Sequence, residues 1–405
     1  MTPNAPRGTY GLRLLAEPSV QRTAVTLVLA LVLGFRVLQL AAFSGEIQWG
    51  YDFSAYWRAG VHLLAGEPIY DADQLAGPYA PQRQYLYLYP PPLAAAVSPL
   101  AAAVPDDYRL ANWAWFALGA AILIATVLAV GRREGLFDPS RFSGLLAGRR
   151  RWLLVGAAFA LPPVVGELVL GNVHLVLLGL LALAWLGIRR GTTGGDALVG
   201  AAIGVAAVIK VFPGILLLWF LITRRWRAAG WVVVGAVAAS VAALPLTGSE
   251  PWRDYPTVLA NLAAPSDTTD TLAPTVWLAP LLGFTGARLV VGALGVAVLA
   301  WSALRQDVRT SFAVAVLVSV LVAPALYHHY LAILVLPLLL ALAGGVRAWA
   351  LAAAYLLLWG GQQAALGELS WIVNRIMPTA GALVLLGGLL VGGRSAPLRR
   401  AGAET

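Results

Sequence analysis

The chain has 405 residues, of which 60% are hydrophobic and 12% are charged, whereas soluble domains carry about 25% charged residues. It contains no cysteine, which excludes disulfides and thiolate chemistry, and its four histidines leave little for a histidine-based metal site. The net charge of +9 comes from arginines between apolar segments, so we expect no nucleic-acid partner. Repeated runs of roughly 20 apolar residues predict an all-α polytopic protein embedded in a lipid bilayer.

The first apolar segment, residues 23–43, is long enough to be a retained span rather than a cleaved signal. Residues 44–110 follow as a long segment rich in proline and tyrosine, which we expect outside the membrane, carrying short interfacial helices. Its YDFSAY motif at residues 51–56 holds Asp52, a carboxylate just beyond the first span. This carboxylate could be a catalytic base or an ordinary loop aspartate.

The later apolar segments predict a single domain, residues 1–405, with about 11–13 transmembrane helices. Residues 197–222 are divided at KVFPG, residues 210–214. Because the arginine cluster at residues 224–227 is expected in the cytoplasm, we predict two helical arms that turn back at this break. Further spans are expected near residues 111–130, 152–165, 172–188, 229–246, 286–304, 311–326, 331–343, 349–361 and 378–392.

Charge is distributed unevenly among the predicted loops. Arginines concentrate in one set, which includes residues 132–151 and the tail after residue 392, whereas acidic residues concentrate in the other set. Arginine-rich loops favour the cytoplasm. We therefore expect a multi-pass protein of a bacterial plasma membrane, with both termini in the cytoplasm and its active site on the extracytoplasmic face.

Lys210 is the only lysine in the chain and lies in the otherwise apolar residues 197–222. A charge inside a membrane costs about 2.5–3.5 kcal/mol or more unless it is compensated. The helix break beside Lys210 suggests an anionic ligand such as phosphate. Snorkelling or pairing with a nearby carboxylate is the simpler alternative.

The YHHY motif at residues 327–330 lies between two predicted spans. Tyrosines are common at membrane interfaces, but adjacent histidines are not. His328 and His329 would point about 100° apart on a helix, so they are not expected to share a metal ion. Either could bind a phosphate or an acceptor hydroxyl, and His329 is slightly preferred.

Two further motifs hold candidate binding residues. Asn172 and His174, in the GNVH motif, begin the fourth span, where Asn172 could equally be a helix N-cap. Glu167 lies nearby and could pair with a cation. Tyr89 belongs to YLYLYPPP, residues 85–92, whose prolines stop any helix; an aromatic membrane-surface segment is the alternative explanation.

The segment after Asp52 adds other candidates. Tyr56 and Arg58 are included as binding residues, and Arg58 could reach the outer headgroup region. Asp71 and Asp73 have the spacing of the acidic metal-binding pair of nucleotide-sugar transferases. No glycine-rich phosphate loop or nucleotide-binding strand accompanies this weak pattern.

Taken in order, these motifs resemble glycosyltransferase family 87, whose members are integral-membrane enzymes that use polyprenyl-phosphate sugars. The family often has Gly-Gln and Asn at the start of the fourth span, where this chain has Gly171, Asn172 and His174. That departure bears on the identity of the acceptor and of the sugar more than on the type of reaction. The resemblance rests on YDFSAY at 51–56, GEPIYD at 66–71, YPP at 89–91, GVAAVIKVFP at 204–213 followed by RRW at 224–226, and HHY at 328–330.

The resemblance implies a GT-C type bundle that transfers a sugar from a polyprenyl-phosphate donor to a glycolipid or glycan acceptor. Asp52 would be the catalytic base, and Lys210 with His328 or His329 would lie near the donor phosphate or the acceptor. Chemical reasoning agrees, because displacement at the anomeric carbon needs a base for the acceptor hydroxyl and polar groups for the departing phosphate.

With one carboxylate of this kind, we expect single-displacement inversion. Mannose is the expected sugar, with arabinofuranose as the alternative. The scheme requires no metal cofactor, although Asp52 with Asp71 or Asp73 stays open as a set of metal ligands.

Two other classes of function compete with the transferase. A transporter or lipid flippase would place polar residues along a path through both sides of the membrane, often with internal pseudo-symmetry. A non-catalytic polytopic scaffold would need no convergent polar residues. The sequence instead gathers Asp52, Lys210 and the two adjacent histidines on one predicted face, which favours the enzyme.

Overall fold

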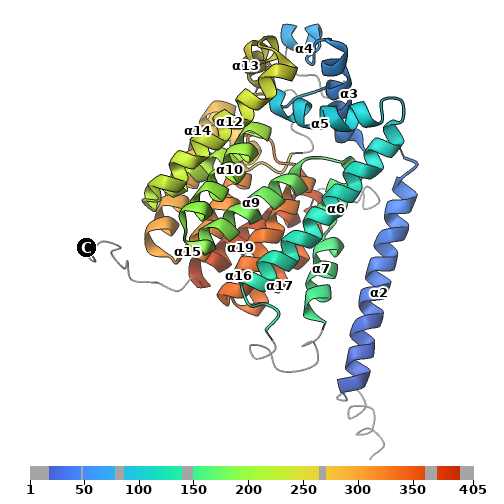
Figure 1. The fold of residues 1–405 in the computed structure, drawn as a ribbon. Coiled ribbons are helices and arrows are strands. Elements are labelled where there is room, and N and C mark those ends of the chain that lie inside the picture. The colour runs from blue at the N-terminus through green and yellow to red at the C-terminus, as the bar shows by residue number, and fades with distance from the viewer. Residues whose placement is uncertain are drawn as a thin grey trace, which may run out of the picture.

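The computed structural model describes residues 18–46, 49–77, 86–138, 149–263, 271–360 and 372–392. Within these ranges all regular secondary structure is helical, so the predicted all-α class is confirmed (Figure 1). The predicted arginine-rich tail after residue 392 lies outside the described residues.

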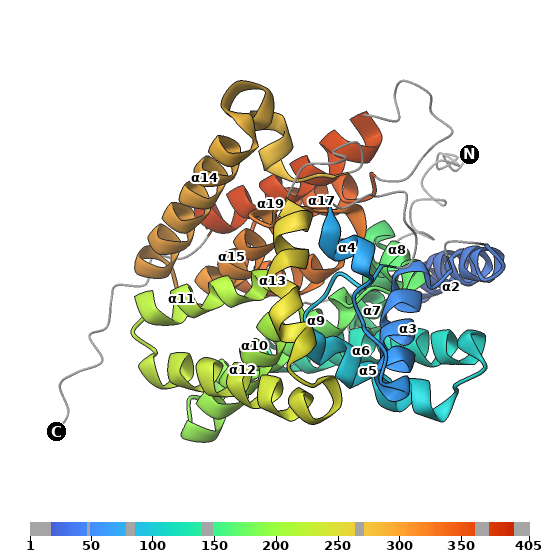
Figure 2. The ribbon, with the colours of Figure 1, turned by 90° about the horizontal axis from the view of Figure 1, so that it is seen from above.

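The helices form one bundle, with α2 standing at its side and α3, α4, α5 and α13 gathered at one end (Figures 1 and 2). In chain order the elements are α2 (Pro18–Phe43), α3 (Tyr51–Ala65), α4 (Ala72–Ala76), α5 (Pro91–Ala103), α6 (Tyr108–Arg133), α7 (Arg150–Ala160), α8 (Pro162–Leu170), α9 (His174–Arg190), α10 (Thr193–Ile209), η2 (Phe212–Ile215), α11 (Leu216–Ile222), α12 (Trp226–Thr247), α13 (Glu250–Ala263), α14 (Pro274–Arg305), α15 (Val308–Leu321), η3 (His328–Leu334), α16 (Val335–Gly344), α17 (Ala348–Leu357), η5 (Ile372–Ile376) and α19 (Met377–Gly392).

Within the described ranges, four helices are long and apolar enough to cross a membrane alone: Tyr108–Arg133, Trp226–Thr247, Pro274–Arg305 and Val373–Gly392. A fifth span results if α7 and α8, which are bent by 65°, are counted together. The other apolar helical stretches, which include Ala30–Phe43 of α2, have 10–17 residues, or about 15–26 Å, against a hydrocarbon core of about 30 Å. The protein is polytopic as predicted. Among the described residues, breaks in the helices leave four or five spans of full length, against the 11–13 transmembrane helices expected.

The predicted turn at Lys210 is present. α10 ends there in extended backbone, and η2 and α11 then carry the chain back. Gly200 lies against Trp231 and Gly204 against Ala236, which makes α10 and α12 parallel neighbours and requires this return. Glycines let two membrane helices approach closely. Lys210 is therefore held at the tip of a helical hairpin.

The long segment at residues 44–110 contains α3, α4 and α5, with α13 lying across this end of the bundle (Figure 2). Gly60 of α3 packs directly against Ser98 of α5. Asn261 of α13 donates a hydrogen bond to the carbonyl of Gln74 in α4 at 2.9 Å. The segment is thus a packed layer of short helices over one end of the bundle.

The other end of the bundle is held by Glu134, whose side chain is completely buried after the last turn of α6. Its carboxylate accepts hydrogen bonds from Arg309 Nε at 2.6 Å and Trp185 Nε1 at 3.1 Å, and pairs with Arg189 at 3.2 Å. A buried carboxylate needs such partners because its desolvation is costly. Since α6 has 26 residues, this cluster lies about 39 Å from the start of that helix.

Gly171 ends α8 with a φ of +68°, in the left-handed region. A Cβ atom at this position would lie 2.7 Å from the Cβ of Phe53 on α3. Glycine accepts this backbone conformation without steric cost and leaves room for the neighbouring helix. It therefore lets α3 lie directly against the junction between α8 and α9.

We predict that Gly171→Ala destabilises the protein more than Gly66→Ala. Both glycines have left-handed backbone, with φ of +68° and +72°, so both substitutions carry the strain of about 1–2 kcal/mol. Only the added methyl at position 171 meets another atom, because nothing lies within 4 Å of the corresponding position at Gly66. Thermal unfolding in detergent should show the larger loss for Gly171→Ala, and equal losses would contradict the steric argument.

Candidate active site

Asp52 lies in the first turn of α3, and the start of this helix is tightly fixed. Gly50, with a φ of +73°, donates its N–H to the Val169 carbonyl at 2.7 Å and accepts a hydrogen bond from the Tyr108 hydroxyl at 2.5 Å. A side chain at Gly50 would overlap Tyr108 and Asn112. These contacts join α3 to α8 and α6, and so fix where Asp52 stands.

Asn172 connects Asp52 to the rest of the site. Its amide oxygen accepts from the N–H of Val173 at 2.7 Å and from the Tyr89 hydroxyl at 3.2 Å. This leaves its amide nitrogen to donate to Asp52 Oδ2 at 2.8 Å and to His329 Nε2 at 3.2 Å. The two sets of contacts agree on a single orientation of the amide, and all four residues are thereby positioned by one side chain.

The ammonium group of Lys210 lies among aromatic and imidazole groups. It donates to the Tyr89 hydroxyl at 3.3 Å and to His174 Nε2 at 3.0 Å. It also stands over the ring of Tyr330, 3.8 Å from the centroid, where a cation is attracted by the face of the ring. Tyr56 packs edge-on against Tyr89, with ring centroids 4.9 Å apart.

Glu167 accepts hydrogen bonds at the start of α9 and is completely buried. Its Oε1 accepts from the N–H groups of His174 at 2.5 Å and Leu175 at 3.3 Å, while its Oε2 accepts from His174 Nδ1 at 2.9 Å. Glu167, rather than Asn172, therefore caps this helix. The N-cap alternative for Asn172 was wrong because the turn at Gly171 points its side chain toward Asp52.

The hydrogen bonds have a consistent direction. Lys210 donates to Tyr89, which donates to Asn172, which donates to Asp52; in the other branch, Lys210 donates to His174. That second branch ends at the carboxylate of Glu167. One cation is thus connected to two carboxylates, which compensates its charge in apolar surroundings.

The two carboxylates differ in access. The side chain of Asp52 is 23% exposed, whereas that of Glu167 is 0% exposed. Burial raises the pKa of Asp52 to about 6, although the hydrogen bond from Asn172 and the positive charge of Lys210 act to lower it. Burial also raises the pKa of Tyr89, so its hydroxyl stays protonated and able to donate.

Most of the predicted site residues meet here. His328 and Arg58 have other surroundings: His328 Nε2 is 2.5 Å from the Gly360 carbonyl, and Arg58 is exposed about 120° around α3 from Asp52. The residues that the structure brings together are Asp52, Tyr56, Tyr89, Asn172, His174, Lys210 and His329.

Two residues of the cluster were missing from the predicted site. Glu167 was noted only as a partner for a cation, and Tyr330 only as an interfacial tyrosine. A signal for Glu167 was available, because it is a single acidic residue in an apolar stretch that begins at Pro162, and such charges are usually functional. Nothing in the sequence indicated that Tyr330 lies beneath Lys210.

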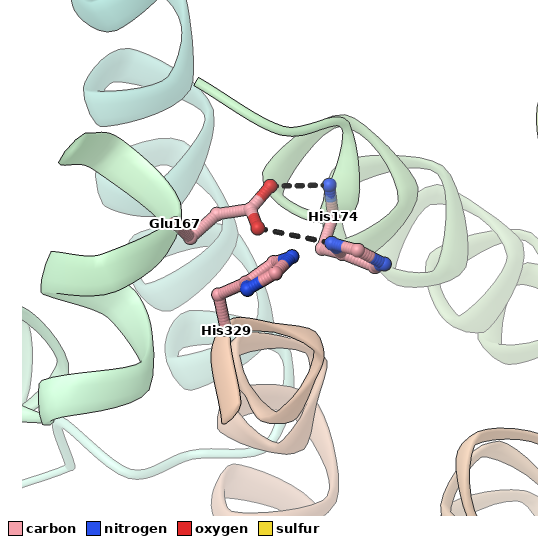
Figure 3. A group of neighbouring side chains, drawn as sticks. All are labelled: Glu167, His174 and His329. Carbon is pink, nitrogen blue, oxygen red and sulfur yellow. Dashed lines mark hydrogen bonds and ion pairs between the residues drawn. The ribbon is translucent and has the colours of Figure 1, made fainter. Parts of the chain in front are cut away.

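Asp71 and Asp73, the predicted alternative metal ligands, lie exposed at α4, where the Asp71 N–H donates to the side chain of Gln74 at 3.3 Å. A different group, Glu167, His174 and His329, is the one among the described residues that can offer three ligand atoms within 4.8 Å of one another (Figure 3).

Both ring nitrogens of His174 are nevertheless engaged, Nδ1 with Glu167 and Nε2 with Lys210. A metal ion on either nitrogen would have to displace one of these partners. Hydrogen bonds therefore account for the approach of His174 to Glu167, and Asn172 holds His329 beside them, which favours a polar network over a metal centre.

A small surface hollow, lined mainly by apolar side chains, borders the cluster. Trp115 and Gly119 of α6 and Leu168 of α8 form part of its wall, and it reaches Glu167 and Asn172.

Comparison with known proteins relates part of the chain to a known family. The model of glycosyltransferase family 87 matches residues 87–324, more than half of the chain. This range includes Glu167, Asn172 and Lys210, whereas Asp52 precedes it and His329 follows it.

Two curated relatives, the α-(1→3)-arabinofuranosyltransferases of Mycobacterium tuberculosis strains CDC 1551 / Oshkosh and ATCC 25618 / H37Rv, are each 30% identical over 220 residues. The matched part is 53% of this chain and 46% of each relative, so the chain spans about half the length of the curated relatives it matches. No solved structure matches. By the extent of the family match, the chain belongs to glycosyltransferase family 87.

Proposed function

We propose that the protein is a membrane glycosyltransferase that moves a sugar from a polyprenyl-phosphate donor to a hydroxyl group of a glycolipid or glycan. The observation that carries the proposal is the setting of Asp52. It is a partly exposed carboxylate, 23% accessible, connected through Asn172 and Tyr89 to the only lysine of the chain. A base and a cation in one network are what this transfer requires.

Asp52 is the better base of the two carboxylates. Both oxygens of Glu167 already accept hydrogen bonds from α9, and its side chain is fully buried. Asp52 Oδ2 accepts from Asn172, while no donor to its Oδ1 occurs among the residues the structure describes. An acceptor hydroxyl can therefore approach Asp52, and the pKa of about 6 leaves this carboxylate ionised at neutral pH.

In the proposed reaction, the acceptor oxygen forms a bond to the anomeric carbon while the bond from that carbon to the phosphate oxygen breaks. The hydroxyl proton moves to Asp52, and the electron pair leaves with the polyprenyl phosphate. Attack from the face opposite the leaving group inverts the anomeric centre.

Lys210 is suited to the departing phosphate. Among the described residues, two of its three N–H donors are used, by Tyr89 and His174. The third donor and the positive charge are available to a phosphate oxygen, and a hydrogen bond of this charge-assisted kind is strong.

The identity of the sugar has two candidates. The motif resemblance favours mannose, whereas the relatives with 30% identity support arabinofuranose. The two polyprenyl-phosphate donors share the same leaving group, so Asp52 and Lys210 would serve either one. We give arabinofuranose the first test because the curated relatives transfer that sugar by name.

We infer that the site faces outward from a bacterial plasma membrane. The arginine-bearing ends of α6, α9 and α15 meet at Glu134, at the opposite end of the bundle from Asp52. Arginine-rich ends favour the cytoplasm, which leaves the site on the other face. Donors on polyprenyl phosphate supply sugars to that face, where nucleotide sugars are absent. Family membership supports this enzyme over the transporter and scaffold alternatives.

We expect Asp52→Asn to reduce transfer by roughly 10²–10⁴-fold, the usual contribution of a general base. Purified protein would be incubated with polyprenyl-phosphate arabinofuranose or mannose and candidate glycolipids, and products would be identified by mass spectrometry as gaining one pentose or one hexose. Unchanged turnover in Asp52→Asn would exclude Asp52 as the base, and absence of any product from either donor with the native protein would argue against the transferase.

The matched control is Asp107→Asn. Asp107 caps α6 by accepting a hydrogen bond from the Leu110 N–H at 2.9 Å. Asparagine caps helices about as well as aspartate. This variant also removes a carboxylate from the same end of the bundle, and should transfer at the native rate.

We predict that kcat/KM falls on the acid side of a pKa near 6. The base must be unprotonated, and burial raises the pKa of Asp52 to about 6. Activity should drop about tenfold for each pH unit below this value and level off above it. In Asn172→Ala, which loses a hydrogen bond that lowers this pKa, the fall should begin at higher pH; a shift to lower pH would contradict the assignment.

We expect Lys210→Met to raise the KM for the donor by about 10–150-fold, as for loss of a hydrogen bond to a charged group worth about 1.5–3 kcal/mol. Donor titrations at saturating acceptor would measure this change. Lys210→Arg keeps the charge and should recover part of the affinity. A donor KM unchanged in Lys210→Met would remove Lys210 from the phosphate site.

A further inference from the structure

Glu167 is the one buried carboxylate of the site that the proposed reaction does not use. It accepts three hydrogen bonds, all from the first turn of α9. Two come from backbone N–H groups and one comes from the ring of His174. The backbone bonds require an oxygen acceptor only, which a glutamine would also supply. The bond to the ring is different, because it determines which nitrogen of His174 carries the proton.

The proton on His174 is assigned by both of its neighbours. Lys210 Nζ lies 3.0 Å from Nε2, and an ammonium group has no lone pair with which to accept a hydrogen bond. Nε2 must therefore be unprotonated, which places the single proton of a neutral ring on Nδ1. That proton is donated to Glu167 Oε2 at 2.9 Å. The carboxylate can only accept, so it favours this tautomer alone.

We propose that Glu167 is a positioning residue that acts through His174. By holding the proton on Nδ1, it keeps the lone pair of Nε2 directed at Lys210, and thereby fixes the ammonium group where the donor phosphate leaves. The inference rests on the proposed function for the role of Lys210, but the tautomer itself is independent of the reaction. Outer partners of a histidine commonly set its tautomer and orientation in this way.

The arrangement also decides between this role and a metal centre built from Glu167, His174 and His329. A metal ion on His174 Nδ1 would leave the proton of a neutral ring on Nε2. That N–H would then point at an ammonium group 3.0 Å away, with two donors facing each other. Lys210 in its present position is therefore compatible with the hydrogen-bonded relay and incompatible with a metal on Nδ1.

The decisive variant is Glu167→Gln. Its side-chain oxygen can still accept from the N–H groups of His174 and Leu175 and so cap α9. Its amide nitrogen, however, donates to Nδ1 instead of accepting from it. The proton of His174 should move to Nε2, where it opposes Lys210. The helix cap is kept while the tautomer changes, which separates the positioning role from a purely structural one.

The first measurement is NMR of protein labelled with ¹⁵N in its four histidines, without donor or acceptor. In the native protein, His174 should show a protonated Nδ1 and an unprotonated Nε2, and in Glu167→Gln the reverse. His174→Gln identifies the signal. If His174 keeps the same tautomer in Glu167→Gln, the proposal is overturned whatever reaction the protein catalyses.

The second measurement is the kinetics of transfer. Glu167→Gln should raise the donor KM by about 10–100-fold, the range known for losing the outer partner of a metal-binding histidine, and should change the acceptor KM little. Glu134→Gln is the matched control, because it also neutralises a fully buried carboxylate that holds helix ends. It should lower thermal stability and leave the donor KM unchanged. An equal rise of the donor KM in both variants would overturn the proposal.

A double variant tests whether Glu167 works through Lys210. If it does, Glu167→Gln combined with Lys210→Met should raise the donor KM no further than Lys210→Met alone, since coupled residues are not additive. Independent, multiplicative effects would overturn the proposal. A metal requirement would also overturn it. The native protein would then lose activity in EDTA and recover it with a divalent metal, and Glu167→Gln would show no such recovery. Failure of the native protein to use any polyprenyl-phosphate donor would contradict the proposed function instead, and would leave the NMR result to stand.

Discussion

The site depends on the side chain of Asn172. An asparagine amide has two N–H donors and one oxygen with two lone pairs, and here all four are used, by Asp52, His329, Tyr89 and Val173. These partners come from α3, η3, the segment before α5 and the start of α9. The side chain of Asn172 thus reaches partners as many as 157 positions away in the chain and holds their segments together. Any other residue of similar size would leave at least one of these groups without its partner.

The charges around Asn172 form a second constraint. Lys210 is enclosed by Tyr89, Tyr330 and His174, and two carboxylates terminate its hydrogen-bond network. A buried cation is tolerated only where such partners compensate the loss of water. The directional order of the network means that each member has one protonation state that fits its neighbours. Substituting one member of the network therefore removes a contact and also changes which neighbouring groups donate and which accept.

The sequence allowed the fold class and the turn at Lys210 to be predicted, because each depends on local composition or on the cost of charge in a membrane. It also singled out Asp52, Asn172, His174 and Lys210, which the structure brings together, while the role of Asp52 stays a prediction. It could not separate His328 from His329. That choice depends on η3, where the short helical turn directs one ring to Gly360 and the other to Asn172. Fewer long helices than the 11–13 expected spans occur among the described residues, for a related reason. Hydropathy registers apolar length, whereas breaks such as that between α7 and α8 are set by packing. The proposed role of Glu167 depends on the direction of the hydrogen bonds around His174. The sequence does not contain this information, because it depends on which donor faces which acceptor in the folded protein.

The start of α3 has a consequence for selectivity. Gly50 is confined between the Val169 carbonyl, Tyr108 and Asn112, so the carboxylate two residues later has little freedom to move. In the proposed reaction, a base held so firmly cannot follow a hydroxyl group that arrives in the wrong place. The orientation of the bound acceptor then decides which hydroxyl of its sugar ring reacts. The residues around Asp52 that bind the acceptor, rather than Asp52 itself, therefore determine the regiochemistry of the product.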